Sequence, residues 1–554
     1  MGARDEPASE GFLGALRRLR SRASGQDDQA DTLDLLHRPI DLVPGVAGRG
    51  ETLVGGLYEF GGQTVRAAEV GERGDAPWRH QDAGEYWLGE LHGFAWLRDL
   101  RAAGTGPAAE RGRSLVLDWL QQHRTIGSAA AAWGPESLAR RLSAWLAHSE
   151  FLLQGADDEF DRRFHQALGL QANHLTRTVR NAADGLPQLI ACKGLIETGL
   201  CLPEGERRIS QGHKLLEAAL AKQVLGDGGH IERNPSAQLE TLWCLAGLRA
   251  TLEATERPGW PALSESIARL APTLRLFRHG DGGLALFNGG LEEECGLIDL
   301  ALSRGGAGSG AAPLDAPEVG FRRIEGRHAT LIADTGAPSA TGRSAHAGTL
   351  SFELSAGRER LVVNCGGWRG PDDGWREALR GTAAHSTLIV DDTNSANLGV
   401  DGSIGEGPNT VKVERRDQDG ATWIDADHDG YLDALGLIHK RRLYAGAEGA
   451  DVRGEDTLTH LRQRRRRGRQ FAVRFHLHPD VRCAMTEDRR AVLLRLQSGA
   501  VWQMRAAGAS MSIDESVYAG DGATRRRTSQ VTLIGPIEDT TTVKWALKLL
   551  PKGS

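Results

Sequence analysis

The chain has 554 residues, and its 67 basic and 73 acidic side chains give a formal net charge of −6. Since a domain typically has about 150 residues, this length predicts two large domains or several smaller ones. The hydrophobic fraction of 40% excludes disorder of the whole chain, the negative charge argues against a nucleic-acid coat, and no apolar run reaches the roughly 18 residues of a membrane-spanning helix.

Residues 1–45 are predicted to form a flexible N-terminal arm around one short amphipathic run at 12–20. A secretory signal needs a longer apolar stretch without interrupting arginines. The six cysteines are scattered and include no CxxC pair, so they suit a reducing compartment better than a disulfide framework or a zinc finger. The sequence therefore predicts a cytoplasmic protein.

Residues 46–304 are predicted to form a helical domain. Apolar residues such as Trp87, Leu91 and Phe94 recur at three- and four-residue steps, which is the period of one helix face. Breaks that carry Gly, Pro or Asp separate about eight helices in this region. The clearest helical stripes cover 158–181, 186–202, 208–223, 236–254 and 260–277.

The Gly-rich stretch 305–313 is predicted to link this domain to a β-rich domain over 314–554. After the linker the hydrophobic period changes to two, as in Leu350, Phe352 and Leu354. Many short strands separated by Asp-Gly turns favour an antiparallel sandwich or barrel. The predicted strands are 350–354, 360–364, 386–390, 410–414, 422–426, 471–478, 491–496, 501–505 and 529–534.

No single catalytic motif such as GxSxG, a P-loop or HExxH occurs in the sequence. Polar clusters instead lie beside the periodic segments. Each cluster alone is better explained by a structural role than by a catalytic one, but Gly-flanked loops are where functional residues concentrate. The clusters are Asn173-His174, 227–235, 344–352, 382–387 and 428–431.

The order and spacing of these motifs resemble the heparinase II/III-like polysaccharide lyases over roughly residues 80–540. The resemblance implies an incomplete (α/α) toroid followed by an antiparallel β-sandwich, with a substrate cleft between them. It also implies cleavage of a uronic-acid glycan by β-elimination. The motifs that carry it are Trp133-x-Pro135-x4-Arg140-x4-Trp145, Asn173-His174, Asp227-Gly228-Gly229-His230-x-Glu232, His346-Ala347-x-x-Leu350-Ser351-Phe352, Asn364-Cys365-Gly366 and Ala384-His385-Ser386-Thr387.

β-Elimination needs groups that neutralise the uronate carboxylate, a base for the neighbouring C–H proton and an acid for the leaving oxygen. By resemblance, Asn173 and His174 face the carboxylate. His346, His385 or Tyr431 is expected to transfer the protons. The resemblance also implies substrate-binding roles for five residues: His230, Glu232, Arg233, Asn234 and His385.

The sequence departs from the family pattern in two places. The tyrosine expected shortly after Glu232 is missing from 234–238, so Tyr431 is the predicted substitute. The HxHxD motif reads Ser344-x-His346-x-Gly348. Because Asn364 stands where an acidic metal ligand would, no cofactor is expected to be required, and a structural zinc at His346, Asn364 and His385 is left open.

The sequence is compatible with three functions. The main hypothesis is a lyase that acts on an acidic polysaccharide or oligosaccharide. The missing tyrosine and HxHxD residues favour an alternative, a non-catalytic protein that binds acidic glycans on the same scaffold. The arginine-rich run 462–469 suggests a third, binding to nucleic acid or to a membrane surface, although a solvated loop explains that run more simply and no nucleic-acid partner is predicted.

Overall fold

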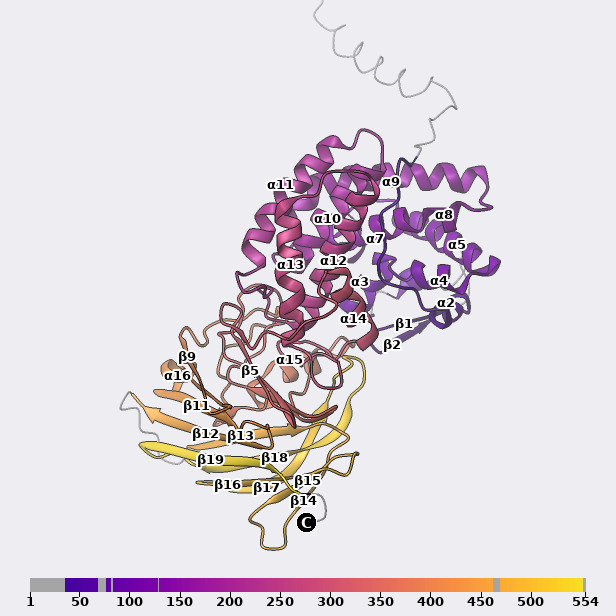
Figure 1. The fold of residues 1–554 in the computed structure, drawn as a ribbon. Helices are drawn as coiled ribbons and strands as arrows, with labels where there is room; N and C mark the ends of the chain where they lie inside the picture. Colours follow the sequence, from indigo (N-terminus) through magenta and orange to yellow (C-terminus); the bar gives the residue numbers. More distant parts are fainter. Residues whose placement is uncertain (1–34, 68–75, 81–82, 128, 462–468, 552–554) are drawn as a thin grey trace, which may run out of the picture.

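The computed structural model describes residues 35–67, 76–80, 83–127, 129–461 and 469–551, and it has two halves of different architecture (Figure 1). Apart from one short hairpin within residues 57–66, the regular structure up to residue 304 is helical, and antiparallel sheets follow from residue 315. This arrangement confirms the predicted fold class. Most of the predicted arm, residues 1–34, and the arginine run 462–468 lie outside the described residues, while Ile40 already packs on the helices and donates its N–H to Thr251 Oγ1 at 3.0 Å.

The helical half wraps layers of helices around α10, which is buried on every side as an inner helix must be. Among the described residues, no helix is long and apolar enough to cross a membrane. The helices are α2 (Ala47–Val54), α3 (Glu85–Gly93), α4 (Leu97–Ala103), α5 (Gly106–Gln122), α6 (Ala130–Trp133), α7 (Pro135–Ala147), α8 (Ser149–Leu153), α9 (Asp158–Thr178), α10 (Leu186–Cys201), α11 (Glu206–Gln223), α12 (Pro235–Ala254), α13 (Pro261–Leu276) and α14 (Cys295–Arg304).

The helices α9 to α13 match the predicted stripes within a few residues at each end. The apolar stripe through Trp87 differs, because it is divided between the short helices α3 and α4. Phe94 follows α3 with φ of 58°, a left-handed conformation that ends the helix. The ring of Phe94 stays buried against Trp78, Trp96 and Trp145, so the side-chain pattern continues although the backbone does not.

A buried arginine of α7 connects that helix to four others. Arg141 of α7 is 0% exposed, and it donates to the backbone carbonyls of His92 and Ala132 and to Gln171 Oε1. Its guanidinium also lies 4.0 Å from the centre of the Trp119 ring. Because these partners belong to α3, α6, α9 and α5, one side chain fixes the packing of the first helices.

The described residues of the β-rich half form a sandwich of two antiparallel sheets and no closed barrel (Figure 1). One sheet contains β3 (Asp315–Ala316), β4 (Phe321–Glu325), β5 (Ala329–Asp334), β6 (Phe352–Ala356), β7 (Glu359–Val363), β8 (Leu388–Val390), β13 (Gln470–Leu477), β17 (Ser510–Tyr518) and β18 (Arg526–Pro536). The other contains β9 (Val411–Gln418), β10 (Ala421–His428), β11 (Leu437–Ala445), β12 (Asp451–His460), β14 (Arg482–Met485), β15 (Val492–Arg495), β16 (Val501–Ala507) and β19 (Thr540–Leu549).

The core between these sheets holds a charged pair as well as apolar side chains. Arg441 of β11 pairs with Asp456 of β12, and both are 1% exposed. The Nη1 group of Arg441 donates to the carbonyls of Leu350 at 2.8 Å and Ser386 at 2.9 Å. Because Ser386 directly follows His385, this pair holds a loop that belongs to the candidate site.

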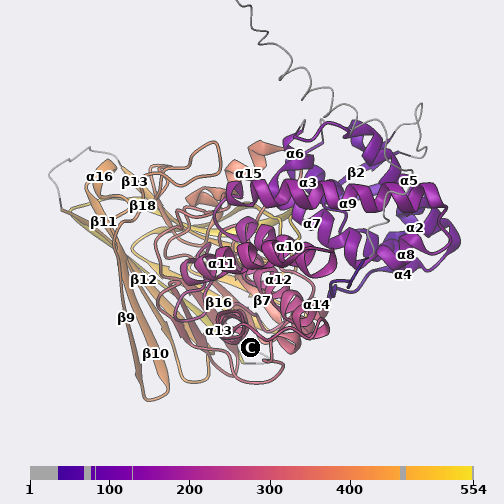
Figure 2. The ribbon, with the colours of Figure 1, turned by 90° about the horizontal axis from the view of Figure 1, so that it is seen from above.

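The two halves are joined by several contacts between distant parts of the chain. The Asp227 carboxylate accepts the N–H groups of Glu318 and Val319 at 2.7 and 2.9 Å. The hairpin of β1 (Leu57–Phe60) and β2 (Gln63–Arg66) reaches the sandwich, and its Gly62 lies against Ala523. Seen from above, the short helix α15 (Asp373–Arg380) of the β-rich half lies beside α3 (Figure 2).

Candidate active site

The loop between α11 and α12 brings a carboxyl group without a cation to the junction of the two halves. Glu232 is 8% exposed, and its Oε1 accepts the N–H of Leu186, the first residue of α10, at 2.8 Å. Among the described residues no basic side chain pairs with it. Burial raises its pKa to about 7, and the nearby Glu240 and Glu136 add to the effect. A substantial fraction of this carboxyl group is therefore protonated at neutral pH.

Two histidines of the β-rich half form a chain of hydrogen bonds with a fixed direction. The carbonyl of Gly381 accepts from Nδ1 of His385 at 2.8 Å. Nε2 of His385 must then accept, so Nδ1 of His346, 3.1 Å away, donates to it. This pattern leaves Nε2 of His346 without a proton, and burial keeps the pKa of both rings below the ordinary value, to about 4 for His385. Both histidines are neutral at pH 7.

The free nitrogen of His346 faces a glycine in the loop that precedes α14. A Cβ atom at Gly289 would lie 3.4 Å from Nε2 of His346, so this nitrogen lies against the Gly289 loop. The neighbouring Asn288 accepts the N–H of His346 at 3.2 Å and donates to the carbonyl of Arg233 at 3.1 Å. Asn234 donates to Ser344 Oγ at 3.4 Å. Hydrogen bonds thus connect the loop of Asn234 with the loop of His346, and His346 with His385, while Glu232 lies against Gly342 of the same loop.

Two residues predicted to bind substrate instead hold the junction together. Arg233 is 7% exposed and donates to the carbonyls of Val319 and Ala337, both at 2.7 Å, and to the Asp334 carboxylate. His230 is 1% exposed, and its Nε2 lies 3.3 Å from Gln223 Oε1. Protein groups occupy both buried side chains, and the substrate contacts of Arg233 and His230 stay a prediction.

Tyr431, predicted to transfer protons, is enclosed within the sandwich. Its side chain is 0% exposed inside the sandwich, where the hydroxyl donates to the carbonyl of Leu388 at 2.9 Å. Burial raises the pKa of this phenol well above its usual range. A glycan at the domain junction has no access to such a group.

Asn173 and His174 lie on α9, and their contacts are with the helical half. Asn173 is exposed, and its carbonyl accepts from Nε of Arg177 at 3.1 Å. The His174 ring packs edge-on against Trp133 with centroids 5.5 Å apart. No contact in the described part of the chain joins either side chain to Glu232, His346 or His385, so their catalytic roles stay a prediction.

The residues assigned to a zinc site do not fit that metal. Asn364 uses Nδ2 to donate to Glu353 at 3.1 Å and Oδ1 to accept from the N–H of Ser386 at 3.0 Å. The two histidines bond to each other, and zinc requires three or four converging ligands. Within the described ranges, no three His, Cys, Asp or Glu side chains are grouped to hold a metal ion.

A second group of charged side chains at the junction was not predicted from the sequence. Arg140 of α7 pairs with Glu136 at 2.9 Å and with Glu240 of α12 at 2.5 Å. Glu90 of α3 lies in the same group, and burial raises its pKa. Arg369 of the sandwich stacks 4.9 Å above the Tyr86 ring. We call Tyr86, Glu90, Glu136, Arg140, Glu240 and Arg369 the junction cluster; only the Glu136–Arg140 spacing was recognisable in the sequence.

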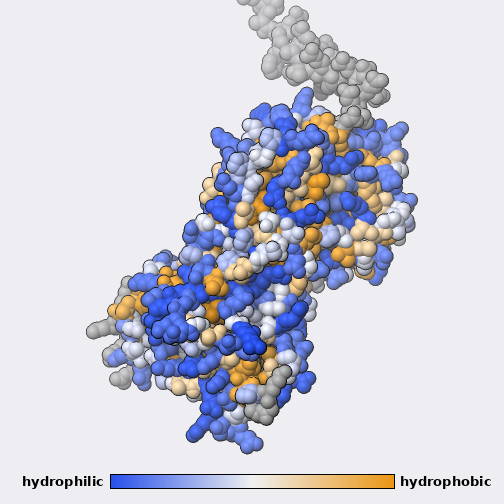
Figure 3. Space-filling model, in the orientation of Figure 1, coloured by the Kyte–Doolittle hydropathy of each residue, from blue (hydrophilic) through white to orange (hydrophobic). Residues whose placement is uncertain are grey.

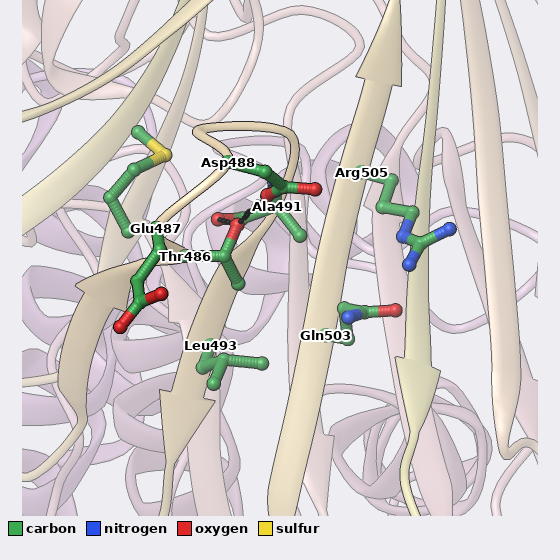
Figure 4. A pocket seen from close by; sticks show the side chains of 8 residues that line it. Thr486, Glu487, Asp488, Ala491, Leu493, Gln503 and Arg505 are labelled. Carbon is green, nitrogen blue, oxygen red and sulfur yellow. Dashed lines mark hydrogen bonds between the residues drawn. The ribbon is translucent and has the colours of Figure 1, made fainter.

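The visible surface of both halves is largely hydrophilic (Figure 3). A pocket of about 590 Å³ lies on the sandwich, away from the junction (Figure 4). It is lined by residues of β14 to β16 and their connecting turn, with Leu493 among apolar groups and Arg505 among charged ones. A hydrogen bond from Thr486 to Asp488 at 2.7 Å closes the turn. None of the predicted site residues lines this pocket.

Comparison with known proteins decides the family. A family model described as "Heparinase II/III-like, C-terminal" matches residues 309–546. The chain is also 34% identical over 506 residues to FtsZ-localized protein C of Caulobacter vibrioides, covering 88% of this chain and 85% of that protein. The chain belongs to the heparinase II/III-like family.

Solved structures of the heparinase II/III-like family share the whole fold. The crystal structure of heparinase III matches with a TM-score of 0.73 and 14% identity over 97% of this chain and 89% of that one. A mutant of the heparan sulfate lyase HepC from Pedobacter heparinus matches with a TM-score of 0.63 and 15% identity, covering 98% and 88%. The helical half is thus the predicted toroid, and the fold is that of a polysaccharide lyase family.

Proposed function

We propose that the protein is a polysaccharide lyase that cleaves a uronic-acid glycan by β-elimination at the junction of toroid and sandwich. The observation that carries the proposal is the chain from Gly381 through His385 to His346, which leaves Nε2 of His346 free of a proton. A neutral imidazole with a defined free nitrogen is suited to act as a general base.

The carboxyl group of Glu232 supplies the neutralisation that the reaction needs. In its protonated form it donates a hydrogen bond to the uronate carboxylate, and its pKa of about 7 keeps that form populated at neutral pH. The Asn234 amide retains an N–H for the same carboxylate, because it gives only one long hydrogen bond to Ser344. Withdrawing charge from the carboxylate makes the proton on the neighbouring carbon more acidic.

His346 then moves the proton. Nε2 takes it from the carbon next to the carboxylate, the electron pair forms the new C=C bond, and the bond to the glycosidic oxygen breaks. The imidazolium of His346 returns the same proton to that oxygen, so one residue serves as base and then as acid, and a separate tyrosine is not needed. No step of this route uses a metal ion or another cofactor.

The assay is the ultraviolet absorbance of the unsaturated uronate formed from a panel of uronate glycans. We expect turnover on one substrate and a loss of at least about 100-fold in kcat for His346→Ala, since general bases contribute 10²–10⁴-fold. His213→Ala is the matched control, because His213 lies on α11 and contacts Trp260 and Glu217. Equal kcat in the two variants would contradict the role of His346.

A flat absorbance trace together with glycan binding would establish the alternative, a non-catalytic glycan-binding protein. The missing tyrosine and the incomplete HxHxD motif favour that outcome. Binding to an acidic glycan and a cytoplasmic location are parts of both proposals.

A second function is favoured by the relative from Caulobacter vibrioides, whose name states that it is localised by FtsZ. The similarity extends over 88% of this chain at 34% identity, so we also propose that this protein associates with FtsZ. It should then co-sediment with FtsZ polymers, and it should remain in the supernatant when FtsZ is omitted. Equal sedimentation with and without FtsZ would exclude the association.

A further inference from the structure

Among the described residues, acidic side chains outnumber arginines where the proposed substrate would lie. The acidic side chains at the junction include Glu136 and Glu240, which are 38% and 40% exposed and therefore reach solvent. Glu232 and Glu90 lie beside them, and burial raises the pKa of each. Glu293 adds a further carboxylate at the sandwich side.

The arginines at the junction are already engaged by these carboxylates. Arg140 is held between Glu136 and Glu240 at 2.9 and 2.5 Å. Arg369 lies 3.6 Å from Glu293 and is attracted by Glu240 and Glu90 as well.

Arginines at the outer edge of the junction are also paired with a glutamate. Arg343 and Arg376 both approach the Glu85 carboxylate, at 3.9 and 3.8 Å. The described part of the junction therefore presents arginines that share their charge with glutamates.

We propose that the junction accepts unsulfated glycans whose charges are isolated uronate carboxylates, and that it discriminates against sulfated chains of the same backbone. This inference rests on the proposed function and specifies its substrate class. A single uronate can be met by the protonated Glu232, which donates a hydrogen bond instead of repelling the ligand. A sulfate group stays ionised and needs unpaired guanidinium or ammonium groups, and here it would face Glu136 and Glu240.

The test compares two pairs of polymers with the full chain: unsulfated heparosan against heparin, and unsulfated chondroitin against chondroitin sulfate. Calorimetric titration at 150 mM salt should give a Kd at least about tenfold lower for the unsulfated member of each pair. Equal or tighter binding of the sulfated members would overturn the inference and leave the proposed lyase activity standing.

A pair of variants tests the cause. Glu240→Gln releases Arg140 from one carboxylate, so the preference for the unsulfated polymers should shrink by about threefold or more. Glu253→Gln is the control, because Glu253 lies on the same helix with 69% exposure and pairs with Arg249 instead. An unchanged preference in Glu240→Gln would overturn the assigned cause.

The failure of the two proposals can be told apart. A preference for unsulfated polymers without an absorbance rise removes the lyase chemistry and supports the charge inference. An absorbance rise that is faster with the sulfated polymers supports the lyase chemistry and overturns the charge inference. Absence of binding to all four polymers removes the proposed substrate class and this inference together.

Discussion

Glu232 shows how the surroundings of one residue set its charge state. Its carboxyl group is enclosed by the N-terminus of α10 on one side and by Gly342 on the other, where a Cβ atom would come within 2.9 Å of it. The N–H of Leu186 favours the ionised form, and burial outweighs it. The same side chain on an open loop would be fully ionised at pH 7.

Replacing Glu232 by Gln should stabilise the protein at high pH. The ordinary pKa is 4.5 and the folded pKa is about 7, so the folded state of the wild type binds the extra proton between these values. The free energy of unfolding of the wild type therefore falls by roughly 3 kcal/mol as the pH rises from 4.5 through about 7. Gln keeps the acceptor for Leu186 and does not ionise.

Urea unfolding followed by tryptophan fluorescence checks this prediction. At pH 8, Glu232→Gln should exceed the wild type in free energy of unfolding, and at pH 4 the two should agree. Glu253→Gln should match the wild type at both values, because Glu253 is exposed. A Glu232→Gln advantage that is the same at both pH values would contradict the raised pKa.

At the level of the elements, prediction from sequence succeeded where one face of an element carries apolar residues. The stripes over 158–181 and 236–254 correspond to α9 and α12 because their apolar faces pack on the toroid core. The break at Phe94 was not predictable in this way, because the backbone turns while the side chain stays buried.

Strands β11 and β12 escaped prediction for a different reason. Their inward positions alternate as expected, but several hold polar residues or glycine: His439, Arg441, Gly454 and Asp456. Gly454 is required there, since a Cβ atom would lie 2.0 Å from the Trp545 ring. A charged network inside a sandwich hides the hydrophobic alternation on which strand prediction depends.

The candidate site was predictable in part. Gly-flanked motifs identified the loops of Glu232, His346 and His385, because loops on a rigid scaffold carry function. The sequence could not reveal that Tyr431 is buried or that Arg233 bonds to β5, since both facts depend on long-range packing. The junction cluster was missed because its members come from three helices and one sandwich loop.

At the scale of the whole molecule, Arg233 joins toroid and sandwich, and its loss should uncouple them. Arg233→Met leaves the Asp334 carboxylate buried without its cation, which should cost about 3 kcal/mol or more of unfolding free energy. We also expect one cooperative unfolding transition to separate into two when followed by calorimetry. Arg327→Met is the control, because Arg327 is 79% exposed and lies 3.9 Å from Glu448.

The double variant Arg233→Met with Asp334→Leu removes both buried charges and should recover most of the lost stability. If the single variant unfolded like the wild type in one transition, the ion pair would not be what couples the two halves.

The contact between Gly62 and Ala523 has a consequence for synthesis on the ribosome. The two residues are about 460 positions apart in the chain. At translation rates of ~5–20 residues per second, Ala523 leaves the ribosome roughly 20–90 seconds after Gly62. The β1–β2 hairpin, among the first ordered pieces to emerge, therefore waits for almost the entire polypeptide before its last neighbour arrives. During that interval the nascent toroid exposes the future junction to solvent, and chaperones have time to bind it before the sandwich closes over it.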